Sequence, residues 1–136
     1  MTKSILLIDD ERIFTFIAEK LIVGLGVEAK ILAAETGEQG LTLIRENFLA
    51  SGSLPLLILV DFYMSPMDGV TFVKSFYELD IPGKEKTLIA LTTSSNVSTD
   101  IELAKSAGVH TFLAKPIAEI KLKEILEKAS LLSEIL

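Results

Sequence analysis

Short apolar runs alternate along the chain with longer stretches in which apolar residues recur at helical spacing. The runs cover residues 5–8, 29–33, 56–60, 88–91 and 112–114, and the second is the least clear. Each stretch that follows has apolar residues three or four positions apart, which is typical of an amphipathic helix. Five strand and helix pairs in strict alternation predict an α/β fold, in which a parallel sheet has helices on both faces.

The helical stretches are bounded by breakers and caps. The first is predicted over 13–25, and its broad apolar face is expected to comprise Ile13, Phe16, Ile17, Ala18, Leu21 and Leu25. The other helices are expected from Thr36, over 70–77, over about 97–107 before the cap residue Gly108, and from about 117 onward.

The length of 136 residues suits one domain. A closed eight-stranded α/β barrel typically needs roughly 250 residues, so an open, doubly wound sheet is predicted. We expect residues 1–136 to form this single domain, with no residues left for a second, output-type domain.

Charge and residue usage exclude several classes of function. The net charge of −6 provides no electrostatic footprint for nucleic acid or an anionic membrane. Cysteine is absent and there is one histidine, which leaves oxygen atoms as the ligands for any metal. No apolar stretch reaches the length of a transmembrane helix, and a cytoplasmic location is expected.

Chemically active side chains follow four of the five apolar runs. In open α/β sheets, sites form at the carboxyl ends of the strands, where these side chains would converge. The residues at these positions are Asp9, Asp10 and Glu11 after the first run, Asp61 after the third, Thr92 and Thr93 after the fourth, and Lys115 and Pro116 after the fifth.

Carboxylates crowded at one edge need a cation, and Mg²⁺ is the natural one for oxygen ligands. Asp9, Asp10 and Asp61 would form the cage. Asp61 could then stay ionised and act as a nucleophile toward phosphorus, forming an acyl phosphate. The Thr92 hydroxyl and the Lys115 ammonium are available to bind the phosphoryl oxygens.

Each of these residues also has an ordinary structural explanation. Asp9, Asp10 or Asp61 could cap a helix or turn, Thr92 could be a satisfied loop residue, and Lys115 could be solvated. Their occurrence together, after four different apolar runs, favours a phosphoryl-binding site over these separate explanations.

The sequence resembles the receiver domain of two-component response regulators over essentially its whole length. The matching segments are ILLIDDE at 5–11, LILVDFYMSPMDG at 57–69, LIALTT at 88–93 and AGVHTFLAKPI at 107–117. The resemblance implies a flavodoxin-like (βα)5 fold, similar to single-domain chemotaxis regulators, with strand order 2-1-3-4-5. It also implies a phosphoacceptor signalling protein rather than a turnover enzyme.

The resemblance assigns roles to individual residues. Asp61 would accept a phosphoryl group from a sensor histidine kinase or a histidine phosphotransfer protein. Asp10 and Asp61 would ligate Mg²⁺ directly, Asp9 mainly through water, and Tyr63 through its backbone carbonyl. Lys115 would bind a phosphoryl oxygen.

The resemblance also implies a conformational switch. Thr92 would move toward the phosphate and Phe112 would turn inward, although Phe112 could instead be a permanently buried core residue. The bond between Lys115 and Pro116 is a candidate cis peptide. The switched surface would cover about 97–136, comprising the fourth helix, the fifth strand and the fifth helix, and would bind a downstream protein or a second copy of the chain.

Three features depart from the common pattern of the family. Pro66 lies one place later than usual in the segment from Asp61 to Gly69, and Thr93 stands where a small residue is common. Tyr63 occupies a position that tunes how water reaches the acyl phosphate, and its bulk predicts slow self-dephosphorylation.

Three other functions compete with phosphoacceptance. A pseudo-receiver would bind partners without phosphorylation, but the chain retains the acceptor residues. A phosphatase of the haloacid dehalogenase type would need an aspartate two residues after Asp61, where Tyr63 stands. A flavodoxin-like mononucleotide binder would need a phosphate loop where this chain has the acidic sequence DDER.

Overall fold

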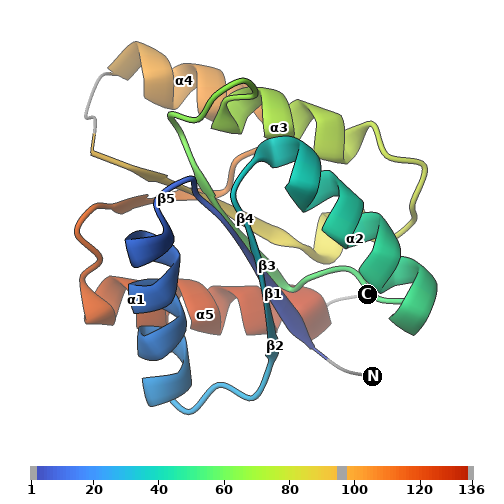
Figure 1. Cartoon of the computed structure of the whole chain (residues 1–136), viewed down its shortest axis with the longest axis horizontal. Helices are drawn as coiled ribbons and strands as arrows, with labels where there is room; N and C mark the ends of the chain where they lie inside the picture. Colours follow the sequence, from blue (N-terminus) through green and yellow to red (C-terminus); the bar gives the residue numbers. More distant parts are fainter. Residues whose placement is uncertain (1–2, 95–97, 135–136) are drawn as a thin grey trace.

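The computed structural model describes residues 3–94 and 98–134, and five parallel strands form one sheet in this part of the chain (Figure 1). The order β2-β1-β3-β4-β5 confirms the predicted topology. The strands are β1 (Ser4–Ile8), β2 (Lys30–Ala34), β3 (Leu57–Asp61), β4 (Leu88–Thr93) and β5 (Thr111–Ala114).

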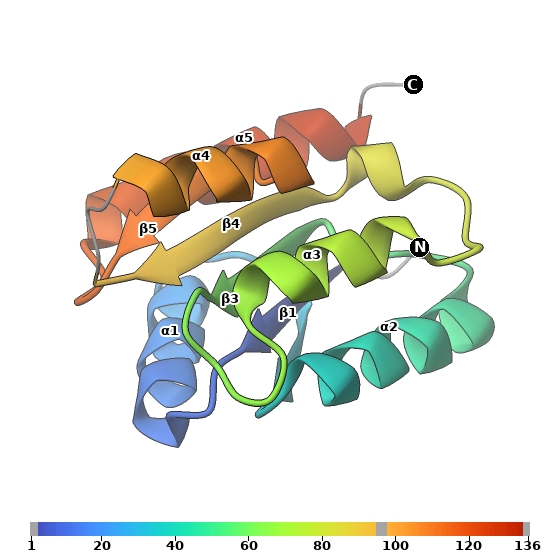
Figure 2. The same ribbon diagram turned by 90° about the horizontal axis from the view of Figure 1, so that it is seen from above.

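Helices cover both faces of the sheet, so the fold is doubly wound. α1 and α5 pack on one face, while α2, α3 and α4 lie in a row on the other (Figures 1 and 2). Their bounds are α1 (Arg12–Gly24), α2 (Gly37–Ser51), α3 (Gly69–Tyr77), α4 (Ser98–Ala107) and α5 (Glu119–Glu134), and a short 3-10 turn η1 (Lys84–Lys86) precedes β4. The predicted start of the fourth helix at Val97 and the last two residues of the predicted surface, Ile135 and Leu136, lie outside the described residues.

The central strands are buried on both faces because alternate side chains enter opposite halves of the core. In β1, Leu6 and Ile8 pack toward α2 and α3, whereas Ile5 and Leu7 pack toward α1 and α5. The edge strands β2 and β5 are only partly covered. This difference explains why the central runs were the clearest strand signals in the sequence.

The apolar face predicted for the first helix is wrong in part. Ile13, Phe16 and Ile17 are 76%, 62% and 47% exposed, whereas Ala18 and Ile22 are buried. Phe14 and Leu21 of α1, and Leu25 directly after it, are partly buried and pack against the core. Apolar residues lie around most of this short helix, and contact with α5 and the sheet determines which of them are covered.

A side-chain cap marks the start of α2, and a glycine follows the end of α4. Thr36 caps α2 by accepting a hydrogen bond from the Gln39 amide at 3.0 Å, as its position predicted. Gly108, after α4, has a φ of +108°, and a Cβ there would lie 2.5 Å from the ring of Tyr77. Within the described ranges, no helix combines the length and the apolar character needed to cross a membrane.

Candidate functional site

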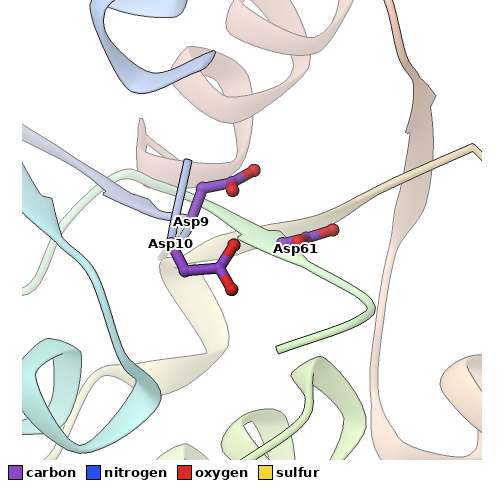
Figure 3. A group of neighbouring side chains, drawn as sticks. All are labelled: Asp9, Asp10 and Asp61. Carbon is purple, nitrogen blue, oxygen red and sulfur yellow. The ribbon is translucent and has the colours of Figure 1, made fainter. Parts of the chain in front are cut away.

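Three carboxylates converge at the carboxyl edge of the sheet. Asp9 and Asp10 follow β1, and Asp61 is the last residue of the adjacent strand β3 (Figure 3). A carboxylate oxygen from each lies within 4.8 Å of the other two. Asp9 is 1% exposed and Asp61 is 7% exposed, so two of the three charges are held out of water. Such crowding is unfavourable without a compensating positive charge.

The capping explanation for the first two aspartates does not account for their positions. Glu11 is the residue at the N-cap of α1, and no side chain caps that helix through a hydrogen bond from this position. Asp9 does accept a hydrogen bond from the Glu11 amide at 2.9 Å, which orients its carboxylate at the strand end.

Lys115 supplies the positive charge. Its ammonium lies 2.7 Å from Asp9 Oδ2, 3.4 Å from Asp61 Oδ1 and 3.6 Å from Glu11 Oε1. The same nitrogen lies 4.4 Å from the centre of the Phe14 ring, a cation–π arrangement. Lys115 follows β5 across the sheet, so a residue far away in the sequence completes the acidic cluster.

Burial and the neighbouring charges together shift the pKa values of Asp61 and Lys115. Burial, followed by repulsion from Asp9, raises the pKa of Asp61 to about 6, against the lowering effects of Lys115 and of a hydrogen bond from the Tyr63 backbone. Burial by itself lowers the pKa of Lys115, but its hydrogen bond to Asp9 and the attraction of Asp61 outweigh burial and raise it. Protonated Lys115 is therefore stable here, while an ionised Asp61 would gain from further positive charge.

Thr92 lies directly beside the Asp61 backbone, because the two residues are register partners in β3 and β4. Thr92 is 1% exposed, and its hydroxyl oxygen has no hydrogen-bond partner within the described residues. Buried hydroxyls are normally satisfied, so one without a partner at a strand end suggests a group that it would bind. Thr93 is also buried, at 8% exposure.

The loop after β3 returns sharply to α3. The Gly69 amide donates to the Phe62 carbonyl at 3.0 Å, and a Cβ at Gly69 would lie 2.5 Å from the Asp61 carbonyl oxygen. Asp68 caps α3 by accepting from the Thr71 amide at 2.7 Å. Both Ser65–Pro66, where the proline is displaced, and Lys115–Pro116 are cis peptide bonds.

The two remaining predicted residues lie in the loop after β3 and in β5. Tyr63 is 55% exposed, and its hydroxyl donates to Asp100 Oδ2 at 2.7 Å. Phe112 is half-buried in β5, at the register position opposite Leu91. Its ring packs partly buried against the core on the side of α2, α3 and α4, and its inward turn stays a prediction.

Sequence reasoning missed Phe14 and Asp100 as neighbours of the site. Phe14 looked like an ordinary residue of an apolar helix, and its position one turn after the Asp9–Glu11 segment was the only available signal. Asp100 lies in the first turn of α4, where an acidic residue is ordinarily explained by the helix dipole.

The comparisons with known proteins agree on the family. The family model described as the response regulator receiver domain matches residues 5–127. The transcriptional regulatory protein ZraR of Salmonella typhimurium is 32% identical over 127 residues, which cover 92% of this chain and 26% of ZraR. The chemotaxis protein CheY of Bacillus subtilis is 27% identical over 94% of this chain and 98% of CheY.

Solved structures have the same architecture. A two-component response regulator from Cytophaga hutchinsonii superposes with a TM-score of 0.81 at 25% identity, over 95% of this chain and 97% of that one. The chemotaxis protein CheY4 of Vibrio cholerae has a TM-score of 0.80 at 19% identity, over 95% and 99% of the two chains, and supports the fold alone.

The chain belongs to the response regulator receiver family, the signalling domains of two-component systems. It spans only about a quarter of the length of the ZraR proteins that it matches. The residues at its acidic edge suit a divalent cation, because three carboxylate oxygens lie together and the raised pKa of Asp61, caused first by burial and then by repulsion from Asp9, shows that its charged form is disfavoured without one.

Proposed function

We propose that Asp61 accepts a phosphoryl group in a Mg²⁺-dependent reaction and that this modification switches a partner-binding surface. The observation that carries the proposal is the buried hydroxyl of Thr92, which has no partner in the described residues and lies in register with Asp61. A phosphoryl oxygen on Asp61 would accept its hydrogen bond. Lys115, 3.4 Å from the Asp61 carboxylate, is placed to bind a second oxygen.

The phosphoryl donor in this proposal is a phosphohistidine of a sensor histidine kinase or a histidine phosphotransfer protein. A carboxylate oxygen of Asp61 attacks phosphorus while the phosphorus–nitrogen bond breaks. The electron pair of that bond returns to the imidazole, which leaves as neutral histidine once it carries one proton. The product is an acyl phosphate on Asp61, and water later releases it as inorganic phosphate.

Asp10 and Asp61 would hold Mg²⁺ directly, with Asp9 acting through water and the Tyr63 carbonyl as a further ligand. When bound, the ion would neutralise charge shared between the carboxylates and the incoming phosphoryl oxygens. The role of Lys115 is then to exchange its contact with Asp9, now 2.7 Å long, for one with the phosphoryl group. Its raised pKa keeps it protonated for that purpose.

Tyr63 and Thr93 are the residues expected to prolong the acyl phosphate. Tyr63 places an aromatic ring two residues after the acceptor, and Thr93 adds a buried methyl and hydroxyl beside Thr92. Both restrict the approach of water to phosphorus. Tyr63→Ala should therefore release phosphate faster than the wild type, and slower release from this variant would count against the proposal.

The surface that responds is proposed to lie on α4, β5 and α5. Leu103 and Ile120 are 59% and 69% exposed there. A shallow cavity of about 300 Å³ lies between the three elements and is lined by Ile101, Phe112 and Ile125, among others. Movement of Thr92 toward the phosphate would allow the Phe112 ring to turn inward and reshape this cavity. The partner would be a downstream protein or a second copy of the chain.

The testing experiment compares the wild type with Asp61→Asn. Each protein is incubated with acetyl phosphate or beryllofluoride, with and without Mg²⁺, and followed by intact mass and by NMR. We expect a Mg²⁺-dependent gain of one phosphoryl group in the wild type and none in Asp61→Asn. A wild type that does not respond, or a response that Asp61→Asn retains, would overturn the proposal. Binding at the α4–β5–α5 surface is then tested by sizing the phosphorylated protein.

A further inference from the structure

One hydrogen bond joins the loop after β3 to the beginning of α4. The Tyr63 hydroxyl donates to Asp100 Oδ2 at 2.7 Å, although the residues are 37 positions apart. Asp100 lies in the first turn of α4, one residue before Ile101 of the cavity described above. A hydrogen bond to a charged acceptor is stronger and more directional than one between neutral groups. The bond therefore constrains where α4 begins relative to the loop.

The other end of Tyr63 contacts the acceptor. Its backbone amide is hydrogen-bonded to the Asp61 carboxylate, and this bond lowers the pKa of Asp61 against the effect of burial. Tyr63 thus connects the side chain that would be phosphorylated with a carboxylate on α4. The connection needs only one intervening residue and does not pass through Thr92 or Phe112.

We infer that the Tyr63–Asp100 hydrogen bond is a tether that holds α4 in its unphosphorylated position, with Asp100 a positioning residue that acts through Tyr63. The inference rests on the proposed phosphorylation of Asp61. Conversion of that carboxylate into an acyl phosphate replaces the group that the Tyr63 amide contacts. The backbone at Tyr63 must then adjust. This movement shifts the Tyr63 ring and weakens its hydrogen bond to Asp100.

A simpler role for Asp100 would be to stabilise α4 by placing negative charge near the helix N-terminus. The two roles of Asp100 predict that different substitutions will change the behaviour of α4. Tyr63→Phe keeps the ring and the Asp100 charge but removes the hydrogen bond. Asp100→Asn removes the charge but keeps an oxygen that can accept from Tyr63. Helix stabilisation would be sensitive to Asp100→Asn and insensitive to Tyr63→Phe, whereas the tether predicts a larger effect for Tyr63→Phe than for Asp100→Asn.

The affinity of the protein for beryllofluoride in the presence of Mg²⁺, measured by titration calorimetry, is the main readout. A tether that favours the unphosphorylated arrangement opposes binding, so Tyr63→Phe and Asp100→Ala should each bind about three- to tenfold more tightly than the wild type. Tyr63→Phe and Asp100→Ala remove the same hydrogen bond, so the double variant should bind no more tightly than either single variant. Asp100→Asn keeps a neutral and therefore weaker acceptor, so its affinity should lie between those of the wild type and Asp100→Ala.

Glu102→Ala is the matched control, because it removes another exposed carboxylate from the same helix. It should leave the affinity within about twofold of the wild type. Hydrogen exchange in the unligated protein is a second measurement that does not depend on beryllofluoride. Amides of 100–104 should exchange faster in Tyr63→Phe and Asp100→Ala than in Glu102→Ala.

Single variants that match the wild type in affinity and exchange, or effects that add in the double variant, would overturn the tether alone. A wild type that shows no Asp61-dependent binding would overturn the proposed phosphorylation and the tether with it. The Asp61→Asn comparison therefore separates the two failures.

Discussion

The Lys115 ammonium lies 2.7 Å from the Asp9 carboxylate, and the two residues are separated by 106 positions in the sequence. Lys115 also reaches Asp61 at 3.4 Å, so it neutralises part of the charge of the acidic cluster. The lysine ammonium therefore competes with a bound cation for the same carboxylate oxygens. This arrangement predicts opposite effects of Lys115 on two steps of the proposed reaction.

Replacement of Lys115 by methionine should tighten Mg²⁺ binding about three- to tenfold, because a competing positive charge is removed from low-dielectric surroundings. Phosphorylation by acetyl phosphate should nevertheless slow at least about tenfold, because a phosphoryl oxygen loses its charged partner. Lys30→Met is the control, because it removes the same charge from the edge strand β2, on the other side of the sheet from β5. If Mg²⁺ binding weakened in Lys115→Met, competition between lysine and metal would be disproved.

Asp61→Asn should increase the free energy of unfolding in Mg²⁺-free buffer at pH 7. Burial and repulsion from Asp9 make the ionised carboxylate unfavourable, as its pKa of about 6 indicates. The gain should be about 1–2 kcal/mol, less than the full pKa shift implies because the amide of the variant is itself a buried polar group. Urea denaturation measures it, with the exposed Asp80→Asn as control. Added Mg²⁺ should stabilise the wild type more than Asp61→Asn.

Phe14→Leu should slow phosphorylation about two- to fivefold, because the ring that faces the Lys115 ammonium contributes roughly 0.5–1 kcal/mol to its placement. Phe16→Leu is a matched control on the same helix, since Phe16 is exposed and faces Lys20 at 5.3 Å. Phosphorylation rates with acetyl phosphate should separate the two variants. Equal rates in both would show that the Phe14 ring does not position Lys115.

Gly69→Ala should destabilise the protein and disturb the acceptor. A Cβ at this position would lie 2.5 Å from the Asp61 carbonyl oxygen and 2.6 Å from Leu91 Cδ2. The expected loss is about 1–3 kcal/mol, in the range of overpacked core sites, with a large fall in phosphorylation. Gly24→Ala, where a Cβ would meet nothing within 4 Å, should be neutral or stabilising. Denaturation midpoints of the two variants provide the comparison.

His110 should make stability fall on acidification. Burial lowers the pKa of His110, and its Nδ1 accepts the Ile89 amide hydrogen bond at 3.0 Å, which only the unprotonated atom can do. The unfolded chain binds a proton near pH 6.5 while the folded chain does not, so this contribution is complete above that pH and is lost below it. Denaturation of the wild type and His110→Gln between pH 5 and 8 should show a smaller pH dependence in the variant. Parallel curves would contradict this assignment.

The strands, the fold class and most of the site were predictable because they depend on local pattern and on one topological rule. Continuous apolar runs such as 56–60 mark strands buried on both faces, and parallel strands end at a common edge. Asp9, Asp61, Thr92 and Lys115 therefore had to meet there. The structure brings the first two and Lys115 into direct contact and puts Thr92 in register with Asp61.

Other features depended on packing between distant segments. Periodicity placed Phe16 on the apolar face of the first helix and left Phe14 out of it, but the placement of α1 against the sheet decided that Phe16 faces water and Phe14 faces Lys115. The Tyr63–Asp100 hydrogen bond likewise requires the loop after β3 and the start of α4 to be adjacent. Local sequence encodes which side chains are apolar or charged. The distance between two such side chains is set by how whole elements pack, and no local pattern contains it.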